Sequence, residues 1–138
     1  MINNIGIIGY GFVGQAIAFG FSPVVPINVY DKDPNRCMNS LAETVNDSDI
    51  IFVSVPTPMR KDEVNKRNDN IFIIKSTVVP GTTTELSEKF PDLNIIFNPE
   101  FLTERKAKFD FLNQARIVIG GPANLRERVR ELYDLRFN

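Results

Sequence analysis

The sequence contains no histidine and no tryptophan, and it has a single cysteine, Cys37, among 138 residues. Without histidine, the serine–histidine and cysteine–histidine pairs of many hydrolases cannot form, and metal sites lose their commonest ligand. One cysteine can form neither an internal disulfide nor a multi-cysteine zinc site. We therefore predict no metal centre, and the cysteine usage points to a cytoplasmic protein.

An excess of positive charge and a long hydrophobic run are also missing. Lysine and arginine number 16, against 17 aspartate and glutamate residues, for a formal net charge of -1. A protein that binds nucleic acid or a membrane surface would be expected to carry a basic excess. No apolar run approaches the ~20 residues of a membrane span, and residues 1–4 lack the positive start of a signal peptide. We expect neither nucleic acid nor a membrane as a partner.

The length matches one domain, and the hydrophobic and charged fractions, 43% and 24%, are ordinary for a globular protein. Short β-branched runs alternate with helical segments, which is typical of a parallel sheet with crossover helices. The expected strands are residues 5–8, 27–30, 50–55, 71–75, 94–97 and 117–119. The expected helices are residues 12–21, 35–39, 41–46, 83–90 and 125–137. Because the strands show little alternation, we predict an α/β fold in one domain, 1–138, with both faces of the sheet covered.

The connection formed by residues 56–70 is unusual for such a sheet. Its fifteen residues must cross between two parallel strands, and such a crossover with its helix needs at least ~10–12 residues. The segment is also strongly charged and offers few apolar side chains to pack against the sheet. We hypothesise that residues are missing from it near positions 61–64.

A glycine-rich turn, GYGFVG at residues 9–14, follows the first expected strand and opens the first expected helix. In this context the motif is typical of a dinucleotide-binding site. Gly9 allows the tight turn, Gly11 lets the backbone approach a pyrophosphate, and Gly14 lets the helix pack close to the strand. The pyrophosphate would then contact the helix N-terminus at Phe12 and Val13. The alternative is a turn that serves packing only.

Asp31 ends the second expected strand, twenty positions after Gly11. An acid at this place accepts hydrogen bonds from the adenosine ribose hydroxyls. Because a carboxylate repels a 2′-phosphate, the sequence favours NAD over NADP, while Lys32 and Arg36 keep NADP as the minority option. The alternative is a solvated turn acid before Pro34.

Two further strands end in loops at the edge of the sheet where open α/β folds bind ligands. The third is followed by Val55, Pro56 and Thr57, and the fourth by the sequence KST, which contains Thr77. Prolines after a strand often serve only to stop it, and a threonine before a helix often serves only as its cap. Together with the glycine turn, these ends predict a Rossmann-type, doubly wound and mainly parallel sheet.

Six longer motifs resemble one enzyme family. They read GYGFVG, VYDKDP, SDIIFVSVPTP, IIKSTVVPGTT, NPEFLTE and ARIVIGG, and they follow one another over nearly the whole chain. In this order they resemble the N-terminal NAD-binding domain of the UDP-glucose/GDP-mannose dehydrogenase family. The resemblance implies an NAD-dependent oxidoreductase that converts the C6 alcohol of a nucleotide sugar to a carboxylate, in two steps and with two NAD.

The resemblance also implies roles for individual residues. The cofactor-binding positions are Gly9, Gly11, Phe12, Val13, Gly14, Asp31, Lys32, Val55, Pro56, Thr57 and Thr77. In the family, a catalytic cysteine forms a thioester with the oxidised sugar, and water hydrolyses it. The catalytic positions are Glu100, which assists this hydrolysis, Glu104 on the substrate side, and Thr77, which helps to hold the catalytic water. The substrate-binding positions are Phe101, Leu102 and Thr103. By spacing alone, two solvated loop acids are the simpler interpretation of Glu100 and Glu104.

The chain departs from the family in several respects. Residues 1–138 lack the central helical domain, with its catalytic cysteine, lysine, asparagine and aspartate, and the C-terminal UDP-binding domain. Cys37 cannot replace that nucleophile because it lies just beyond the ribose-binding acid. Position 103 is usually arginine in the family and is Thr103 here. We expect this chain to bind NAD without oxidising a sugar, and a homodimer is possible although the family's dimer helix is absent.

Two alternatives remain at this stage. One is the domain of a 3-hydroxyacid or 6-phosphogluconate type dehydrogenase, which would not need the two acids of NPEFLTE. The other is a non-catalytic dinucleotide-binding module.

Arg105 and Lys106 directly follow Glu104 and are placed to meet a substrate pyrophosphate. The arginines of residues 126–130 instead alternate with acids and indicate a solvated helix face.

Overall fold

The computed structural model describes residues 2–54, 67, 69–75, 88, 91–99, 102–114 and 117–137. Within them, five strands form one sheet: β1 (Ile5–Ile8), β2 (Ile27–Tyr30), β3 (Ile50–Val53), β4 (Ile71–Ile74) and β5 (Asn94–Phe97). All pairs are parallel, and the spatial order is β2-β1-β3-β4-β5. The prediction of a parallel, Rossmann-type sheet is confirmed.

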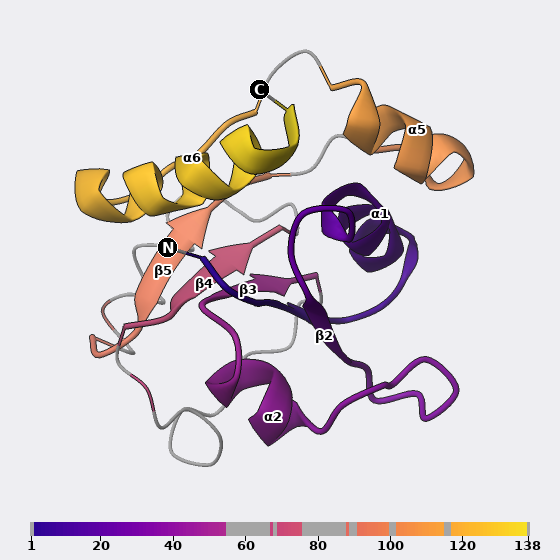
Figure 1. The fold of residues 1–138 in the computed structure, drawn as a ribbon, viewed down its shortest axis with the longest axis horizontal. Coiled ribbons are helices and arrows are strands. Elements are labelled where there is room, and N and C mark those ends of the chain that lie inside the picture. The colour runs from indigo at the N-terminus through magenta and orange to yellow at the C-terminus, as the bar shows by residue number, and fades with distance from the viewer. Residues whose placement is uncertain are drawn as a thin grey trace.

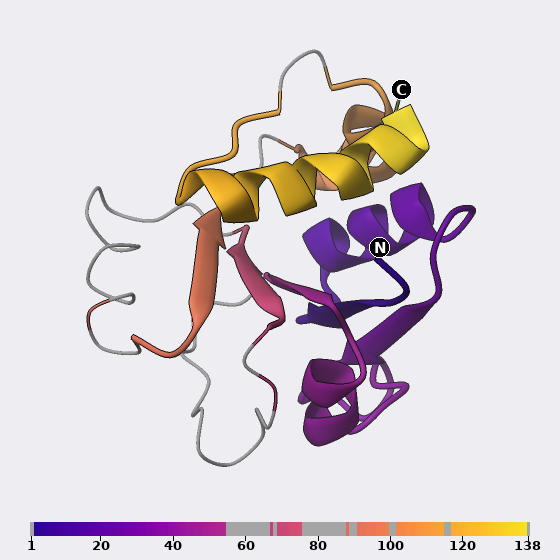
Figure 2. The same cartoon turned by 60° about the vertical axis from the view of Figure 1, so that its left-hand side comes forward.

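Helices cover both faces of this sheet. They are α1 (Phe12–Phe21), α2 (Leu41–Asn46), the 3-10 turn η1 (Glu104–Lys106), α5 (Ala107–Leu112) and α6 (Ala123–Phe137). The helices α1, α5 and α6 lie on one side and α2 on the other, as Figures 1 and 2 show. Along β3, Ile50 and Phe52 join the core under α1 and α6, whereas Ile51 and Val53 join the core beside α2. This is why β3 is apolar at every position.

The larger core is centred on Phe21 at the end of α1. Its ring lies 5.8 Å from that of Phe52, 5.5 Å from Phe111 on α5 and 5.3 Å from Tyr133 on α6. Gly20 makes this packing possible, because a Cβ on it would lie 2.1 Å from the Phe111 ring. The helix α5 is therefore seated directly on the last turn of α1.

Two predicted elements were wrong. Residues 117–119 form no strand; the segment runs antiparallel beside β5 and makes a single bridge between Phe97 and Gly120. The pairing stops there because Gly121 has a φ of 143° and Pro122 lacks an N–H. Residues 35–39 form turns rather than a helix. Of the helix predicted over 83–90, only residue 88 lies among the described residues, and η1 with α5 was not predicted.

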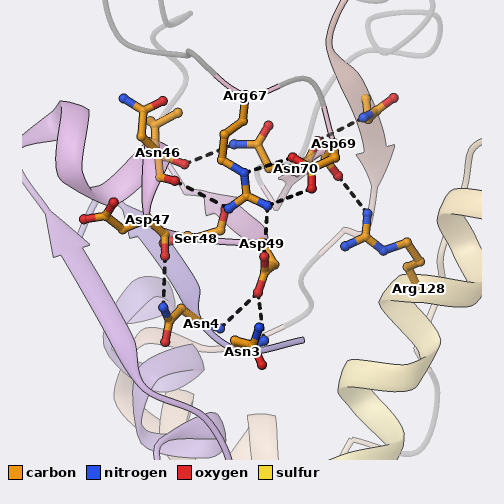
Figure 3. Close-up of polar contacts among 12 residues, drawn as sticks. Asn3, Asn4, Asn46, Asp47, Ser48, Asp49, Arg67, Asp69, Asn70 and Arg128 are labelled. Atoms are coloured by element: carbon orange, nitrogen blue, oxygen red, sulfur yellow. Dashed lines mark hydrogen bonds and ion pairs between the residues drawn. The ribbon is translucent and has the colours of Figure 1, made fainter. Parts of the chain in front are cut away.

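Arg67 joins three strands at their amino ends, as Figure 3 shows. Its Nη2 donates to Oδ1 of Asp49, which precedes β3, at 2.9 Å, and its Nε donates to Oδ1 of Asp69 at 2.9 Å. Asp49 in turn accepts the N–H of Asn3, before β1, at 2.7 Å. Arg128 of α6 donates to the Asp69 carbonyl at 2.7 Å. The positions 61–64, where we hypothesised missing residues, lie outside the described residues.

Two features are absent from the described ranges. No helix there is both long enough and apolar enough to cross a bilayer. Nor do three or more Cys, Asp or Glu side chains gather anywhere in those ranges in a way that would hold a metal ion.

Candidate functional site

The strand order places a topological switch point between β1 and β3. The chain moves from β1 to β2 on one side and continues in β3 on the other, so a crevice opens at the carboxyl ends of β1 and β3. The glycine turn follows β1 at this edge, and Ser54 follows β3, donating its N–H to the Ile8 carbonyl at 2.9 Å. The buried Ser54 Oγ has no hydrogen-bond partner in the described part of the chain. It is a polar group that sequence reasoning missed and that a ligand in the crevice would satisfy.

The three glycines of the turn have different surroundings. Gly9 has a φ of 95°, which only glycine adopts readily, and its N–H donates to the Tyr30 carbonyl at 2.9 Å. A Cβ on Gly14 would lie 2.1 Å from the Gly9 carbonyl oxygen, so the helix and the turn are in direct contact. A Cβ on Gly11 would meet no described atom within 4 Å. Gly11 is therefore the glycine whose surroundings are open to a ligand.

The N-terminus of α1 offers free backbone donors. Gly11 is its N-cap and gives no side-chain cap, and the first helical bond runs from the Gln15 N–H to the Gly11 carbonyl at 2.9 Å. Within the described residues, the N–H groups of Phe12, Val13 and Gly14 have no acceptor. Such groups, together with the helix dipole, bind anions. The donor set and the open space at Gly11 fit the pyrophosphate of a dinucleotide.

Asp31 lies beside this turn at the end of β2. Its Oδ2 accepts the Tyr10 N–H at 2.7 Å, and its Oδ1 accepts the Asp33 N–H at 2.8 Å. The N–H groups of Asp33 and Tyr10 lower the pKa of Asp31, so the carboxylate stays ionised. A carboxylate has about four acceptor positions, so two remain for ribose hydroxyls. Lys32 beside it is exposed, and Arg36 lies 3.9 Å from Asp33.

The predicted substrate-side residues are only partly described. Val55, Pro56, Thr57, Thr77, Glu100 and Phe101 lie outside the described residues. Leu102 is half-buried and packs against the larger core. Thr103 is exposed and donates its N–H and its hydroxyl to Oδ2 of Asp110, at 3.0 and 2.8 Å, which lowers the pKa of Asp110. Glu104 is exposed and lines a groove of about 510 Å³ together with Phe12.

A buried polar cluster at the same edge of the sheet was not predicted. Lys75 follows β4, is 2% exposed, and donates from Nζ to Oδ1 of Asn98 at 2.7 Å. Tyr133 of α6 also donates to Asn98 Oδ1, at 2.5 Å, and Asn98 donates to the Val118 carbonyl at 2.6 Å. The cluster therefore joins the carboxyl ends of β4 and β5. Its only signal in the sequence was a polar residue directly after each of two apolar strands.

Comparisons with known proteins show the family of this chain. Residues 63–136 match the family model described as the UDP-glucose/GDP-mannose dehydrogenase family, NAD binding domain. The UDP-glucose 6-dehydrogenase of Campylobacter jejuni is 41% identical over 73 residues, which is 53% of this chain and 19% of that protein. The UDP-glucose 6-dehydrogenase AglM of Haloferax volcanii is 29% identical over 175 positions, with 85% of this chain and 40% of that protein covered.

Solved structures and chain lengths add two facts. A UDP-glucose dehydrogenase of Pyrobaculum islandicum superimposes with a TM-score of 0.75 at 23% identity, over 99% of this chain and 45% of that one. The chain thus spans less than half of each of these proteins. The AglM alignment runs over 175 positions, more than the 138 residues of this chain. The aligned part of that relative therefore contains residues without a counterpart in this chain.

Proposed function

Because this chain belongs to the UDP-glucose/GDP-mannose dehydrogenase family, we propose that it provides the NAD-binding domain of a nucleotide-sugar dehydrogenase. In this proposal, the enzyme oxidises the C6 alcohol of UDP-glucose, or of a similar sugar nucleotide, to a carboxylate. The matched region is the family's NAD-binding domain, and NAD is its cofactor. The observation that carries the proposal is the pairing of an open glycine turn with an ionised acid, Asp31, at the switch point of the sheet.

In this proposal, the first turn of α1 holds the NAD diphosphate through the N–H groups of Phe12, Val13 and Gly14. Asp31 accepts the adenosine ribose hydroxyls, with Lys32 at the rim of the same pocket. Val55, Pro56, Thr57 and Thr77 are proposed to border the nicotinamide end, because they follow β3 and β4 in the chain. When bound, NAD supplies the hydride acceptor, while this chain binds and orients it.

The substrate side of the proposal rests on the NPEFLTE segment. In the proposal, Glu104, Glu100 and Thr77 are the catalytic positions at the reacting sugar. The residues that line the sugar's binding site are Phe101, Leu102 and Thr103. The cysteine present cannot supply the family's nucleophile, since Cys37 is half-buried beside β2 and its Sγ donates to the Asn39 carbonyl at 2.9 Å. Residues 1–138 alone therefore bind NAD and do not oxidise the sugar.

Three wider statements belong to the same proposal. The partner is a small molecule, a nucleotide sugar, and the product is a sugar acid nucleotide of the kind used in polysaccharide biosynthesis. The place of action is the cytoplasm, where nucleotide sugars and NAD are both present. A homodimer is compatible with the proposal and is not required by it.

Isothermal titration of the purified chain with NAD and with NADP tests the cofactor part. We expect saturable NAD binding, and at least tenfold weaker NADP binding because Asp31 repels the 2′-phosphate. Absence of NAD binding by a folded chain would contradict the proposal. In a second arm, NADH absorbance is followed with UDP-glucose and NAD. Reduction of NAD by residues 1–138 alone would contradict the proposal that this chain does not oxidise the sugar.

A further inference from the structure

The groove between α1 and α5 combines aromatic walls with unpaired cations. It has a volume of about 510 Å³, within the ~300–1,000 Å³ of small-molecule sites. Its lining consists of Phe12, Gln15, Glu104, Arg105, Lys106, Ala107, Lys108 and Phe109. Three of these side chains are cationic and one is a carboxylate, so the groove favours an anion.

The cations of this groove have no ion-pair partner in the described part of the chain. The ion pairs found there involve Arg36, Arg67 and Arg130, and none involves Arg105, Lys106 or Lys108. Asp110, the acid whose pKa Lys106 helps to lower, is already bonded by the N–H and hydroxyl of Thr103. The opposite situation holds on α6, where Arg128 is held by Asp69 and Arg130 faces Asp134.

The walls of the groove are unusually apolar for an exposed surface. Phe109 is 63% exposed and Phe12 is 41% exposed, and they approach the groove from different helices. Lys108 lies with its Nζ 5.3 Å from the ring centre of Phe19, two turns after Phe12 on α1. Flat apolar rings beside arginine and lysine are what a nucleotide requires, with the rings against the base and the cations against the phosphates.

We propose that this groove binds a diphosphate group of a nucleotide through Arg105 and Lys106, with its base against Phe12 and Phe109. The inference deepens the proposed function, on which it rests, because both the dinucleotide and the nucleotide sugar carry a diphosphate. Phe12 belongs to the glycine turn and is also the first residue of α1, so the groove begins at that turn. The N–H groups of that turn hold one diphosphate, and the groove has the charge and the room for a second.

The test compares UDP, inorganic pyrophosphate and NAD as probes by isothermal titration. The variant is Arg105→Gln/Lys106→Gln, and the control is Arg126→Gln/Arg130→Gln, which removes the same charge from α6. Part of α6 contacts Asp69, before β4, and so lies at the opposite end of the sheet. We expect the groove variant to weaken UDP binding at least tenfold and the control to change it less than twofold. Raising the ionic strength should weaken UDP binding by the wild type more than by the groove variant.

A second variant separates the base from the phosphates. Phe109→Ala should weaken UDP severalfold and leave pyrophosphate binding unchanged, and the 63% exposure of this side chain keeps the core intact. Unchanged NAD binding in the groove variant would assign the groove to the nucleotide sugar, whereas a parallel loss of NAD binding would show that the groove and the glycine turn hold the same diphosphate and would contradict a second site. If UDP does not bind, or binds the groove variant as well as the wild type, the groove site is wrong. Failure of the proposed function would be detected separately, because the wild-type protein would then not bind NAD.

Discussion

The backbone N–H of Tyr10 donates a 2.7 Å hydrogen bond to Oδ2 of Asp31, so the acid at the end of β2 supports the glycine turn after β1. The two parts of the proposed NAD site are therefore joined before any ligand binds. A preorganised site loses less conformational freedom on binding.

Replacing this acid should affect cofactor choice more than folding. For Asp31→Asn we expect NAD affinity to fall about tenfold and the preference for NAD over NADP to shrink, since the repulsion of the 2′-phosphate is gone. Titration calorimetry with both cofactors measures this. Asp134→Asn, an exposed acid on α6, is the matched control and should bind both as the wild type does. An unchanged cofactor ratio in Asp31→Asn would remove this acid from the site.

The glycines of the turn should separate folding from binding. In Gly14→Ala the new Cβ would lie 2.1 Å from the Gly9 carbonyl oxygen, so we expect a loss of about 1–3 kcal/mol of stability from the forced shift of α1. In Gly11→Ala the Cβ meets no described atom within 4 Å, so the melting temperature should stay within about 2 °C. NAD binding should nevertheless fall, because the methyl group occupies the place of the pyrophosphate.

Thermal melts and NAD titrations on the same two proteins provide the measurement. Retained NAD affinity in Gly11→Ala, with a normal melt, would show that the diphosphate does not approach this backbone.

Asp49 should make stability depend on acid. Burial by itself would raise the pKa of Asp49, but the N–H of Asn3, the Arg67 guanidinium and the N–H of Asn4 together lower it. A carboxyl whose pKa is lower in the folded than in the unfolded chain stabilises the fold above the unfolded value of about 3.9, and this stability is lost as pH falls through the folded value.

Urea unfolding of the wild type and of Asp49→Asn at several pH values tests this. At pH 7 the variant should be less stable by about 2 kcal/mol, the order expected for hydrogen bonds to a charged group. The difference should shrink steadily below pH 4. A constant difference down to pH 2 would show that the charge of Asp49 contributes nothing.

The polar cluster of Lys75, Asn98 and Tyr133, at the carboxyl ends of β4 and β5, should contribute measurably to stability. Tyr133→Phe removes the hydroxyl that donates to Oδ1 of Asn98, and we expect a loss of about 1–2 kcal/mol in the free energy of unfolding. Tyr30→Phe, at a half-buried position on β2, is the control and should change stability by less than about 0.5 kcal/mol. Equal stabilities for the wild type and Tyr133→Phe, from denaturant midpoints, would contradict a structural role of this hydroxyl.

The local sequence was sufficient for some elements and not for others. The bounds of β1, α1 and β2 were predicted as residues 5–8, 12–21 and 27–30 and agree with the structure. There the glycine turn, the apolar runs and the helical periodicity act over neighbouring residues. The strands β3 and β4 end at Val53 and Ile74, before the predicted 55 and 75, because the end of a strand depends on its neighbours in the sheet.

The helix α5 shows why the rest was not predictable. It is six residues long, and its buried positions are Ala107 and Phe111. A segment this short gives no clear helical period, and its packing depends on a residue distant in the chain, because Gly20 leaves room for the Phe111 ring.

The sequence by itself determined where the five strands and α1 lie in the chain, the glycine turn and the acid that follows β2, because each depends on residues close together in the chain. Only the tertiary structure decided that Lys75 meets Asn98 and Tyr133, which lie 23 and 58 positions away, and that Phe12 shares a groove with Arg105. Such contacts arise from the alignment of separate strands and the seating of helices on them, and no local pattern records them.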